Sequence, residues 1–243
     1  MHVEGSLLSI KSLTDSHRTE MFELMLASFE GLDRSTFLRD LEEKDWVILL
    51  TNGSGRIVGF STQMLSTAEV EGRLVRAIFS GDTIVDPEYW GQTELVRLWG
   101  RFVLQMLDRY GDEPLYWFLI CMGYKTYRFL PVFFHEFFPH YNVETPLHEQ
   151  TILNSLATTR FPETFDPQAG VVRPMENRVR LRPGVADIDP WREKNPHIRF
   201  FAHRNPGHID GDELVCIAPL SRENLKPRAH AIIQRHGTTV MEL

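Results

Sequence analysis

The stretch from Gly81 to Leu95, with the sequence GDTIVDPEYWGQTEL, decides the fold. It continues an apolar β-type run that begins at Val75 and closes at Asp86-Pro87, because proline ends regular pairing. Gly91 then precedes a segment, 92–110, whose apolar residues recur at helical spacing. The stretch therefore predicts a strand, a tight corner and the start of an amphipathic helix.

The elements before and after this stretch complete an alternating pattern. Cap-forming residues precede a helical spacing in the first 30 residues, and the period changes to that of a strand at Trp46. A Gly-rich turn, 52–55, predicts a hairpin. The predicted helices are 14–29, 35–43, 92–110 and 124–137, and the predicted strands are 46–50, 57–65, 75–85 and 115–121. This order is typical of a mixed α/β layer fold.

The C-terminal part carries weaker signals. Thr145-Pro146 predicts the cap and first residue of a helix through Leu156, and the Pro-rich segment 161–196 predicts an extended, wrapping connection. We expect a hairpin of two strands, 197–203 and 213–220, and a short helix after Asn224. The chain 1–243 is thus expected to form a single α/β (α+β) domain. Its core is 15–140 plus the hairpin 197–220, and 142–196 supplies a helix and a wrapping insertion.

Composition excludes several classes of function. The chain has 243 residues, 42% of them hydrophobic, and a net charge of −7, which disfavours disorder and nonspecific nucleic-acid binding. Cys121 and Cys216 lie in apolar runs, as expected of reduced core thiols in a cytoplasmic protein. No apolar stretch is long enough for a membrane span, and the histidines lack a metal-ligand pattern, so we expect neither membrane nor metal binding.

The strand, the Val-x-Pro corner, the glycine loop and the helix start resemble those of the GCN5-related N-acyltransferase (GNAT) superfamily, over about 15–140 plus 197–220. The resemblance implies a mostly antiparallel central sheet flanked by helices, and transfer of an acyl group from acyl-CoA to an amine. It also implies that a helix N-terminus and small residues hold the donor pyrophosphate. The donor-binding residues would then be Ile84, Val85, Trp90, Gly91, Gln92 and Thr93.

The glycine loop departs from the pattern of the superfamily. Trp90 stands where a basic residue is usual, Gly91 is retained, and Thr93 replaces the second glycine. An acyl carrier protein, which presents acyl-phosphopantetheine with one phosphate, is therefore an alternative donor to acyl-CoA. A helix-capping turn without a ligand is the structural alternative.

Acyl transfer to an amine needs a base, a donor for the developing oxyanion and an acid for the thiolate. Asp82, in the apolar strand, is the candidate base; it could instead pair with an arginine or cap a bulge at Gly81. A strand-end amide near Ile84 or Val85 would hold the thioester carbonyl. Tyr127 and His135 are the candidate acids, with core packing as the alternative.

Aromatic residues are concentrated between Tyr116 and Tyr141, where 11 of the 27 occur. Either a helix buried on all sides or the wall of a pocket for a long acyl chain would explain them. The second explanation resembles long-chain N-acyl amino acid synthases of the superfamily. The pocket candidates are Phe118, Tyr124, Phe133, Phe134, Phe137 and Phe138.

We therefore predict an N-acyltransferase that moves an acyl group, with a long fatty acyl chain as one option, from a CoA or acyl-carrier-protein thioester to an amine. The amine is a small molecule or a peptide. The alternative is a non-catalytic GNAT-like domain that binds an acyl ligand or a protein partner. A basic group formed by Arg173, Arg178, Arg180 and Arg182 is either a docking surface for an acidic carrier domain or a solvated loop.

Overall fold

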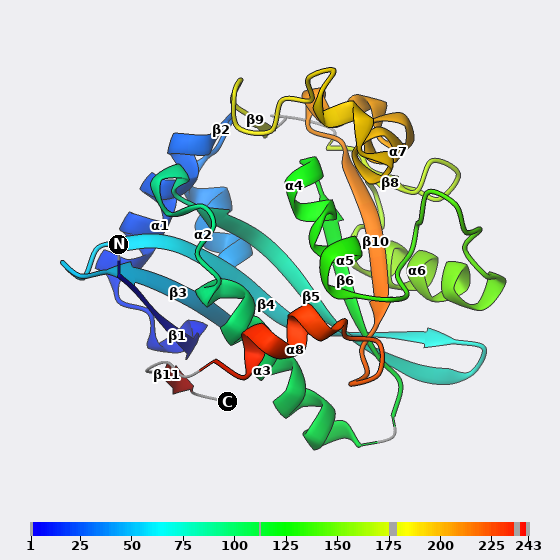
Figure 1. Cartoon of the computed structure of the whole chain (residues 1–243), viewed down its shortest axis with the longest axis horizontal. Coiled ribbons are helices and arrows are strands. Elements are labelled where there is room, and N and C mark those ends of the chain that lie inside the picture. The colour runs from blue at the N-terminus through cyan, green and yellow to red at the C-terminus, as the bar shows by residue number, and fades with distance from the viewer. Residues whose placement is uncertain (1, 112, 175–178, 236–238, 242–243) are drawn as a thin grey trace.

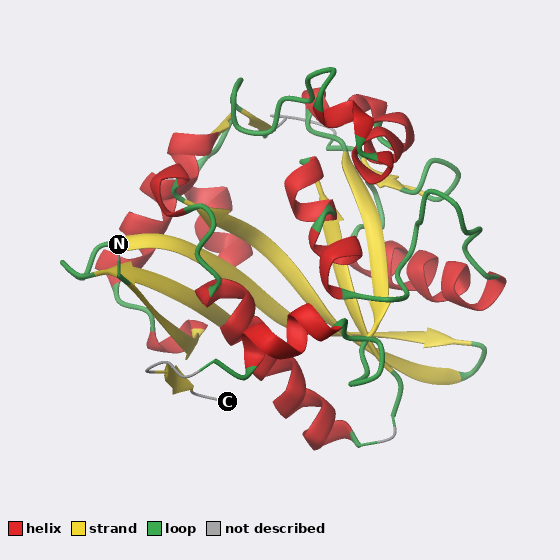
Figure 2. Ribbon diagram, viewed as in Figure 1, coloured by secondary structure: helices red, strands yellow, loops and turns green. Residues whose placement is uncertain are grey.

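The computed structural model describes residues 2–111, 113–174, 179–235 and 239–241, and Figures 1 and 2 show its arrangement. The strands are β1 Val3–Ser9, β2 Phe29–Glu30, β3 Trp46–Asn52, β4 Ile57–Val70, β5 Arg73–Val85, β6 Leu115–Cys121, β7 Phe165–Asp166, β8 Val171–Val172, β9 Arg180–Leu181, β10 Glu213–Pro219 and β11 Thr239–Met241. The α-helices are α1 Asp15–Ser28, α2 Arg34–Glu42, α3 Glu94–Tyr110, α4 Tyr124–Tyr127, α5 Phe129–Phe133, α6 Leu147–Arg160, α7 Pro196–Arg204 and α8 Pro227–Ile233.

The main sheet has the strand order β11-β1-β3-β4-β5-β6-β10-β8-β7. Only the β1–β11 and β5–β6 pairs are parallel among the described strands of this sheet, so it is mostly antiparallel. The prediction of a mixed α/β fold with such a sheet is confirmed. A separate pair, β2 and β9, joins the end of α1 to the Pro-rich segment.

Helices cover both faces of the sheet. Ile48 of β3 packs in one cluster with Leu98 of α3, whereas Val47 packs with Met25 of α1 on the opposite face. We call these the α3 face and the α1 face. The α3 face also carries α8, which crosses α3 in Figure 1, and the α1 face also carries α2 and α6.

The sheet opens between β5 and β6. These strands pair only where residues 76–80 lie beside 115–119, and beyond this point β5 stays with β4. Figure 2 shows β6 diverging from the β3–β5 part of the sheet. The edge of β5 that faces β6 is therefore not paired with β6 over residues 81–85. This edge therefore presents backbone groups to whatever enters the opening.

A β-bulge lies at the start of the opening. Ser61 opposes Thr83 and Gln63 opposes Ser80, so Gly81 and Asp82 together oppose a single residue of β4. An extra residue reverses the alternation of side chains. Asp82 consequently lies on the α1 face.

Gly81 is required in this bulge by close contacts. A Cβ atom at this position would lie 2.7 Å from Thr62 Oγ1 and 2.8 Å from Lys44 Cε. A larger residue would therefore displace both the bulge and the side chains around Asp82.

The prediction of a strand at 197–203, and with it the hairpin 197–220, is wrong. This segment forms α7, because the Asn195 side chain accepts hydrogen bonds from His197 N and Ile198 N, and Pro196 occupies the first turn. Ile198 and Phe201, three residues apart, are its buried residues. Only the second strand, β10, is present, and it pairs with β6.

The predicted helix 124–137 is divided and shorter than expected. α4 ends at Tyr127 and α5 ends at Phe133, because Pro131 has no N–H to donate to the preceding turn. The chain then runs extended, and Phe138 exchanges two backbone hydrogen bonds of 2.8 Å with Ile217 of β10. Tertiary pairing thus overrides the helical tendency of this aromatic segment.

Other elements also differ from the prediction, among them the short strands β2, β7, β8, β9 and β11, which were not predicted. Strand β1 was not predicted, and β4 extends to Val70 because its second half pairs with β5 in a long hairpin. Pro146 is the cap residue of α6 rather than its first residue. The predicted short C-terminal helix is confirmed as α8, and both cysteines are free and buried, as expected.

Candidate active site between β5 and β6

A cavity of about 700 Å³ occupies the opening between β5 and β6. Its wall includes Trp90 and Leu95 next to the α3 face, and Phe37, Phe79 and Phe161 on the α1 face. The cavity therefore crosses the plane of the sheet, and two molecules that enter from opposite faces can meet inside it. Of the predicted site residues, Asp82, Ile84, Val85, Trp90, Gly91 and Gln92 line this cavity.

Asp82 lies in the cavity together with a second carboxyl group, Glu213, at the start of β10. Burial and, to a smaller extent, repulsion from Asp40 raise the pKa of Asp82 to about 6, and the charge of Lys44 opposes this shift. Burial raises the pKa of Glu213 to about 8, with added repulsion from Asp82 and Asp40. Near neutral pH, Asp82 is thus mostly ionised and can accept a proton, whereas Glu213 is mostly protonated.

Glu213 could not be found from the sequence, because its approach to Asp82 depends on strand pairing. Residues 214–219 of β10 pair with β6, and Val215 and Ile217 face α6. Alternation along the strand places Glu213 on this same α1 face. The sequence shows Glu213 only as a carboxylate at the edge of an apolar run, and this pattern alone is a weak indication of a site residue.

The basic groups next to the two carboxyl groups are engaged with α2. Lys44 Nζ lies 2.7 Å from Asp40 Oδ2 and 2.9 Å from the Asp40 carbonyl, with its side chain 1% exposed. Arg160 lies 3.2 Å from Asp40 and 2.6 Å from Glu43. Asp82 was expected to be a base, to pair with an arginine or to cap a bulge at Gly81. It lies in that bulge, and its carboxyl group has no hydrogen-bond or ion-pair partner among the described residues.

Replacing Glu213 with glutamine is expected to stabilise the protein at alkaline pH. Between the ordinary glutamate pKa, 4.5, and about 8, the folded state holds more protons on Glu213 than the unfolded state, so the stability of the wild type falls as pH rises through this window. The Tm difference between Glu213→Gln and wild type should be near zero at low pH and favour the variant above pH 8. Each kcal/mol corresponds to about 2–4 °C. A difference independent of pH would contradict the assignment.

Val85 directs its backbone toward the opening. Asp86 N donates to Val58 O of β4 at 2.8 Å, and N–H directions alternate along an antiparallel strand. The N–H and C=O of Val85 therefore point away from β4 and into the cavity that Val85 lines. Ile84, by the same alternation, directs its amide toward β4. Of the two predicted residues, Val85 is therefore the one placed to hold a ligand carbonyl.

Trp90 lies at the mouth of the cavity and bridges its two sides. Its Nε1 donates to Val85 O at 2.8 Å, and Lys125 Nζ of α4 lies 3.3 Å from the ring centroid. Burial lowers the pKa of Lys125, with repulsion from Arg192. The indole is 48% exposed, so it can move without loss of core packing. A ligand that donates a hydrogen bond to the Val85 carbonyl must displace the indole.

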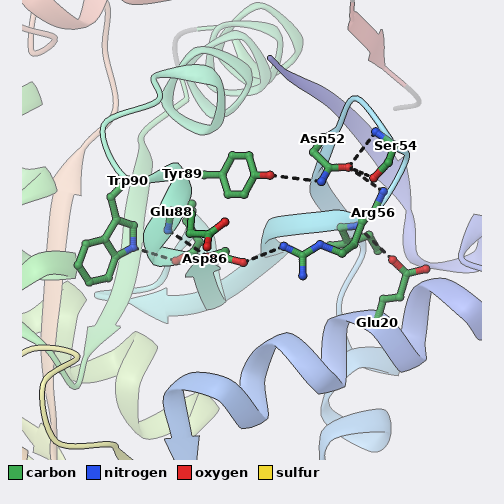
Figure 3. Close-up of polar contacts among 10 residues, drawn as sticks. Glu20, Asn52, Ser54, Arg56, Asp86, Glu88, Tyr89 and Trp90 are labelled. Carbon is green, nitrogen blue, oxygen red and sulfur yellow. Dashed lines mark hydrogen bonds and ion pairs between the residues drawn. The ribbon is translucent and has the colours of Figure 1, made fainter. Parts of the chain in front are cut away.

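The corner before Trp90 is held by side chains of the β3–β4 hairpin (Figure 3). Arg56 lies 3.1 Å from Asp86, whose second oxygen accepts from Glu88 N at 3.1 Å. Asn52 Nδ2 donates to the Tyr89 hydroxyl at 3.2 Å. These contacts fix the path of the chain between β5 and α3, and with it the position of the helix N-terminus.

The N-terminus of α3 carries one favourable group that the sequence did not reveal. Gly91 has a positive φ of 93°, and Thr93 caps the helix without a side-chain cap bond. The Thr93 hydroxyl instead accepts from Arg235 Nη1 at 3.2 Å. Glu94, in the first turn, is bound by Arg97, which reduces the repulsion of an anion there. Arg235 thus supplies a positive charge beside Thr93 at the N-terminus of α3.

The structure does not bring Tyr127 and His135 to the cavity. The Tyr127 hydroxyl donates to Pro139 O at 2.9 Å, and burial raises the pKa of Tyr127 far above its ordinary value. Tyr127 packs against Phe201 of α7, a contact that the mistaken strand at 197–203 concealed. His135 is exposed, and its backbone N–H donates to Asn224 O. Core packing, the alternative for both residues, describes Tyr127, whereas His135 lies on the surface away from the cavity.

The six aromatic pocket candidates have different positions. Phe133 and Phe134 line a narrow apolar extension of about 50 Å³ under α3 and α8, which shares Thr83, Val96 and Phe129 with the main cavity. The other four are buried in the core: Phe118, Tyr124, Phe137 and Phe138. Their burial fits the first explanation for the aromatic concentration, tight packing on both faces of the sheet.

The basic group in the Pro-rich segment makes internal contacts. Arg173 pairs with Asp166 and Asp212, Arg180 lies 2.5 Å from Glu30, and Arg182 donates to Leu26 O at 3.0 Å. Arg178 lies outside the described residues. Arg180 and Arg182 thus attach the insertion to β2 and α1, whereas Arg173 binds Asp166 within the insertion and Asp212 just before β10.

The described residues contain no group of three or more His, Cys, Asp or Glu side chains placed to hold a metal ion. No helix of the described chain combines the length and apolar character needed to cross a membrane.

No protein-family profile and no curated protein matches the chain. Among solved structures, it is similar to a conserved protein of unknown function from Enterococcus faecalis, described as a probable N-acyltransferase, with 12% identity and a TM-score of 0.42 over 56% of this chain and 33% of that one. The chain thus spans about a third of the length of that protein.

Two further similar structures belong to GNAT-family enzymes. One is the N-acetyltransferase YhbS from Escherichia coli in complex with CoA, with 16% identity and a TM-score of 0.37 over 53% of this chain and 69% of that one. The other is an acetyltransferase from Staphylococcus aureus, with 16% identity and a TM-score of 0.39 over 59% of this chain and 95% of that one.

Proposed function

We propose that the protein is a GNAT-type N-acyltransferase that moves an acyl group from a thioester to an amine in the cavity between β5 and β6. The observation that carries the proposal is the presence, in one cavity, of a carboxyl group of raised pKa, Asp82, and a backbone N–H directed into the opening, that of Val85. A base and an oxyanion donor are two of the three groups that aminolysis of a thioester uses, and the attacking nitrogen can itself supply the proton for the thiolate.

In the proposed reaction, Asp82 accepts a proton from the ammonium group of the acceptor, directly or through a water molecule. The amine nitrogen then attacks the thioester carbonyl carbon, and the Val85 N–H stabilises the developing oxyanion. The carbon–sulfur bond breaks as the amide forms, and the thiolate takes the second proton from nitrogen. The products are an amide, a free thiol and one proton released from Asp82. This route needs no separate acid at Tyr127 or His135.

The donor would enter from the α3 face with its phosphate at the N-terminus of α3. Gln92 and Thr93 lie there, and Arg235 adds a positive charge beside Thr93. These few hydrogen-bonding groups could hold either one phosphate or two. We therefore propose both acyl-phosphopantetheine on a carrier protein and acyl-CoA as acyl donors. The Trp90 indole would leave the Val85 carbonyl when the donor binds.

The acyl group would reach the apolar extension lined by Phe133 and Phe134. Val96 of α3 lines both the main cavity and this extension. Val96→Trp is therefore expected to lower kcat/KM for palmitoyl donors by about tenfold or more, because the new side chain would remove the contacts of a few methylene groups. The kcat/KM for acetyl donors should change little. Leu104→Trp, a half-buried change on the same helix away from both cavities, is the control. Equal losses for both donors would contradict the proposed path of the chain.

Donor binding tests the proposed function. Native mass spectrometry and thermal-shift titration of the full chain with acetyl-CoA, palmitoyl-CoA and an acyl carrier protein should show a stabilising donor. If none of the three donors binds, the proposal that the protein is an acyltransferase is contradicted. A donor that binds but yields no amide with any amine of a broad panel would favour the alternative, a non-catalytic domain that binds an acyl ligand.

A further inference from the structure

The part of the cavity on the α1 face has a composition that selects the acceptor. It contains the carboxyl groups of Asp82 and Glu213 at the sheet, and its wall carries Met25, Phe29 and Phe37 of the α1–α2 region. The donor groups described above, by contrast, lie next to the α3 face. The half of the cavity on the α1 face therefore remains for the acceptor.

The two carboxyl groups have no internal counter-ion in direct contact. Neither has a hydrogen-bond or ion-pair partner among the described residues. Lys44, whose charge lowers the pKa of Asp82, has a side chain that is 1% exposed and bound to Asp40. Both residues are half-buried, and a half-buried carboxylate without a partner loses part of its hydration, a cost that a cationic ligand would relieve.

The positive groups of the same half are already neutralised. Arg160 is held between Asp40 and Glu43, and Lys44 is held by Asp40. A ligand carboxylate would have to break one of these pairs and would also face the charge of Asp82. The structure therefore disfavours an amino acid as the acceptor, which separates this chain from the amino acid synthases considered from the sequence.

The remaining wall of this half is mostly apolar and aromatic, with Asp33 and Thr36 of the α2 region as its polar residues. Met25 and Phe37 are 2% and 4% exposed, and Phe79 and Phe161 lie with ring centroids 6.0 Å apart at the other side. Such a wall accommodates an alkyl or aryl group and offers few partners to a polar one.

We infer that the acceptor is a primary amine with one positive charge, an apolar alkyl or aryl body and no carboxylate, whose ammonium group lies at Asp82 and Glu213. This inference rests on the proposed function for the reaction, but the binding of the amine does not require a donor. The ammonium group would favour the ionised form of both carboxyl groups, so binding near neutral pH would release protons from Glu213.

Isothermal titration calorimetry of the full chain without donor tests this inference, with 2-phenylethylamine, 2-phenylethanol and phenylalanine as probes. We expect the amine to bind about 10- to 100-fold more tightly than the other two, the range set by charged hydrogen bonds. In buffers of different ionisation enthalpy, binding of the amine should release protons. Glu213→Gln should weaken it and abolish the proton release, whereas Glu69→Gln, at an exposed position of β4, should change neither.

Each outcome decides the inference. Equal binding of the alcohol, tighter binding of phenylalanine, unchanged binding by Glu213→Gln, or no binding of the amine at millimolar concentration would overturn it. Donor titrations on the same sample separate the two proposals. A donor that binds while the amine does not overturns the acceptor class alone, and an amine that binds while no donor does leaves the amine site standing and contradicts the transferase.

Discussion

Asp82→Asn is expected to lower kcat by about 10²- to 10⁴-fold, the range for loss of a general base, while donor binding stays unchanged. The amide has nearly the shape of the carboxyl group, and Asp82 has no hydrogen-bond or ion-pair partner among the described residues that the change would break. In the wild type, kcat/KM should fall below pH about 6 as Asp82 is protonated. Steady-state detection of free thiol, together with thermal-shift titration of the donor, measures both effects.

Asp45→Asn is the matched control for this substitution. Asp45 is exposed and accepts from Leu65 N at 2.8 Å, a contact that asparagine can also make through its side-chain oxygen. It does not line the cavity. A loss of activity in Asp45→Asn equal to that in Asp82→Asn, or full activity in Asp82→Asn, would remove Asp82 from the reaction.

Val85→Pro is expected to lower kcat by about 10²- to 10³-fold, because proline removes the N–H that would hold the oxyanion. The N–H of Val85 points away from β4, so its loss breaks no β4–β5 ladder bond, and proline is tolerated at such edge positions. The preceding residue, Ile84, is in a strand and so already has the extended conformation that proline requires. Steady-state kinetics and a circular dichroism spectrum would be compared with those of wild type.

Val85→Ala separates the backbone group from the side chain. It keeps the N–H and removes only the two methyl groups, so it should retain most of the activity while losing some packing against the α3-face cluster. If Val85→Pro is folded and fully active, the oxyanion donor lies elsewhere. If Val85→Ala loses as much activity as Val85→Pro, the side chain rather than the amide is responsible.

The central part of the fold could be predicted because its signals are local. The run 75–85, the Asp86-Pro87 corner and the apolar stripe of 92–110 each specify their own element, and together they position Asp82 and Val85 next to a helix N-terminus. Strand alternation alone would have placed Asp82 on the α3 face, since the bulge becomes visible only through pairing with β4.

The rest of the site depends on contacts between distant segments. Glu213 reaches the cavity through β6–β10 pairing, and Arg235 reaches Thr93 from 142 residues away. Tyr127 appeared suitable as an acid because it follows the apolar strand on a helix, but α7, which was taken for a strand, buries it. A single sequence contains no local signal for these three placements.

A crystal structure with a non-reactive thioether analogue of the bound acyl donor tests the central claim most directly. We expect the pantetheine arm to lie between β5 and β6 and the carbonyl oxygen of the analogue to lie about 2.7–3.2 Å from Val85 N. Trp90 should have left the Val85 carbonyl, and Asp82 should face the carbonyl carbon from the α1 face. An analogue bound outside the opening, or with its carbonyl turned away from Val85, would contradict the proposal that acyl transfer takes place between β5 and β6.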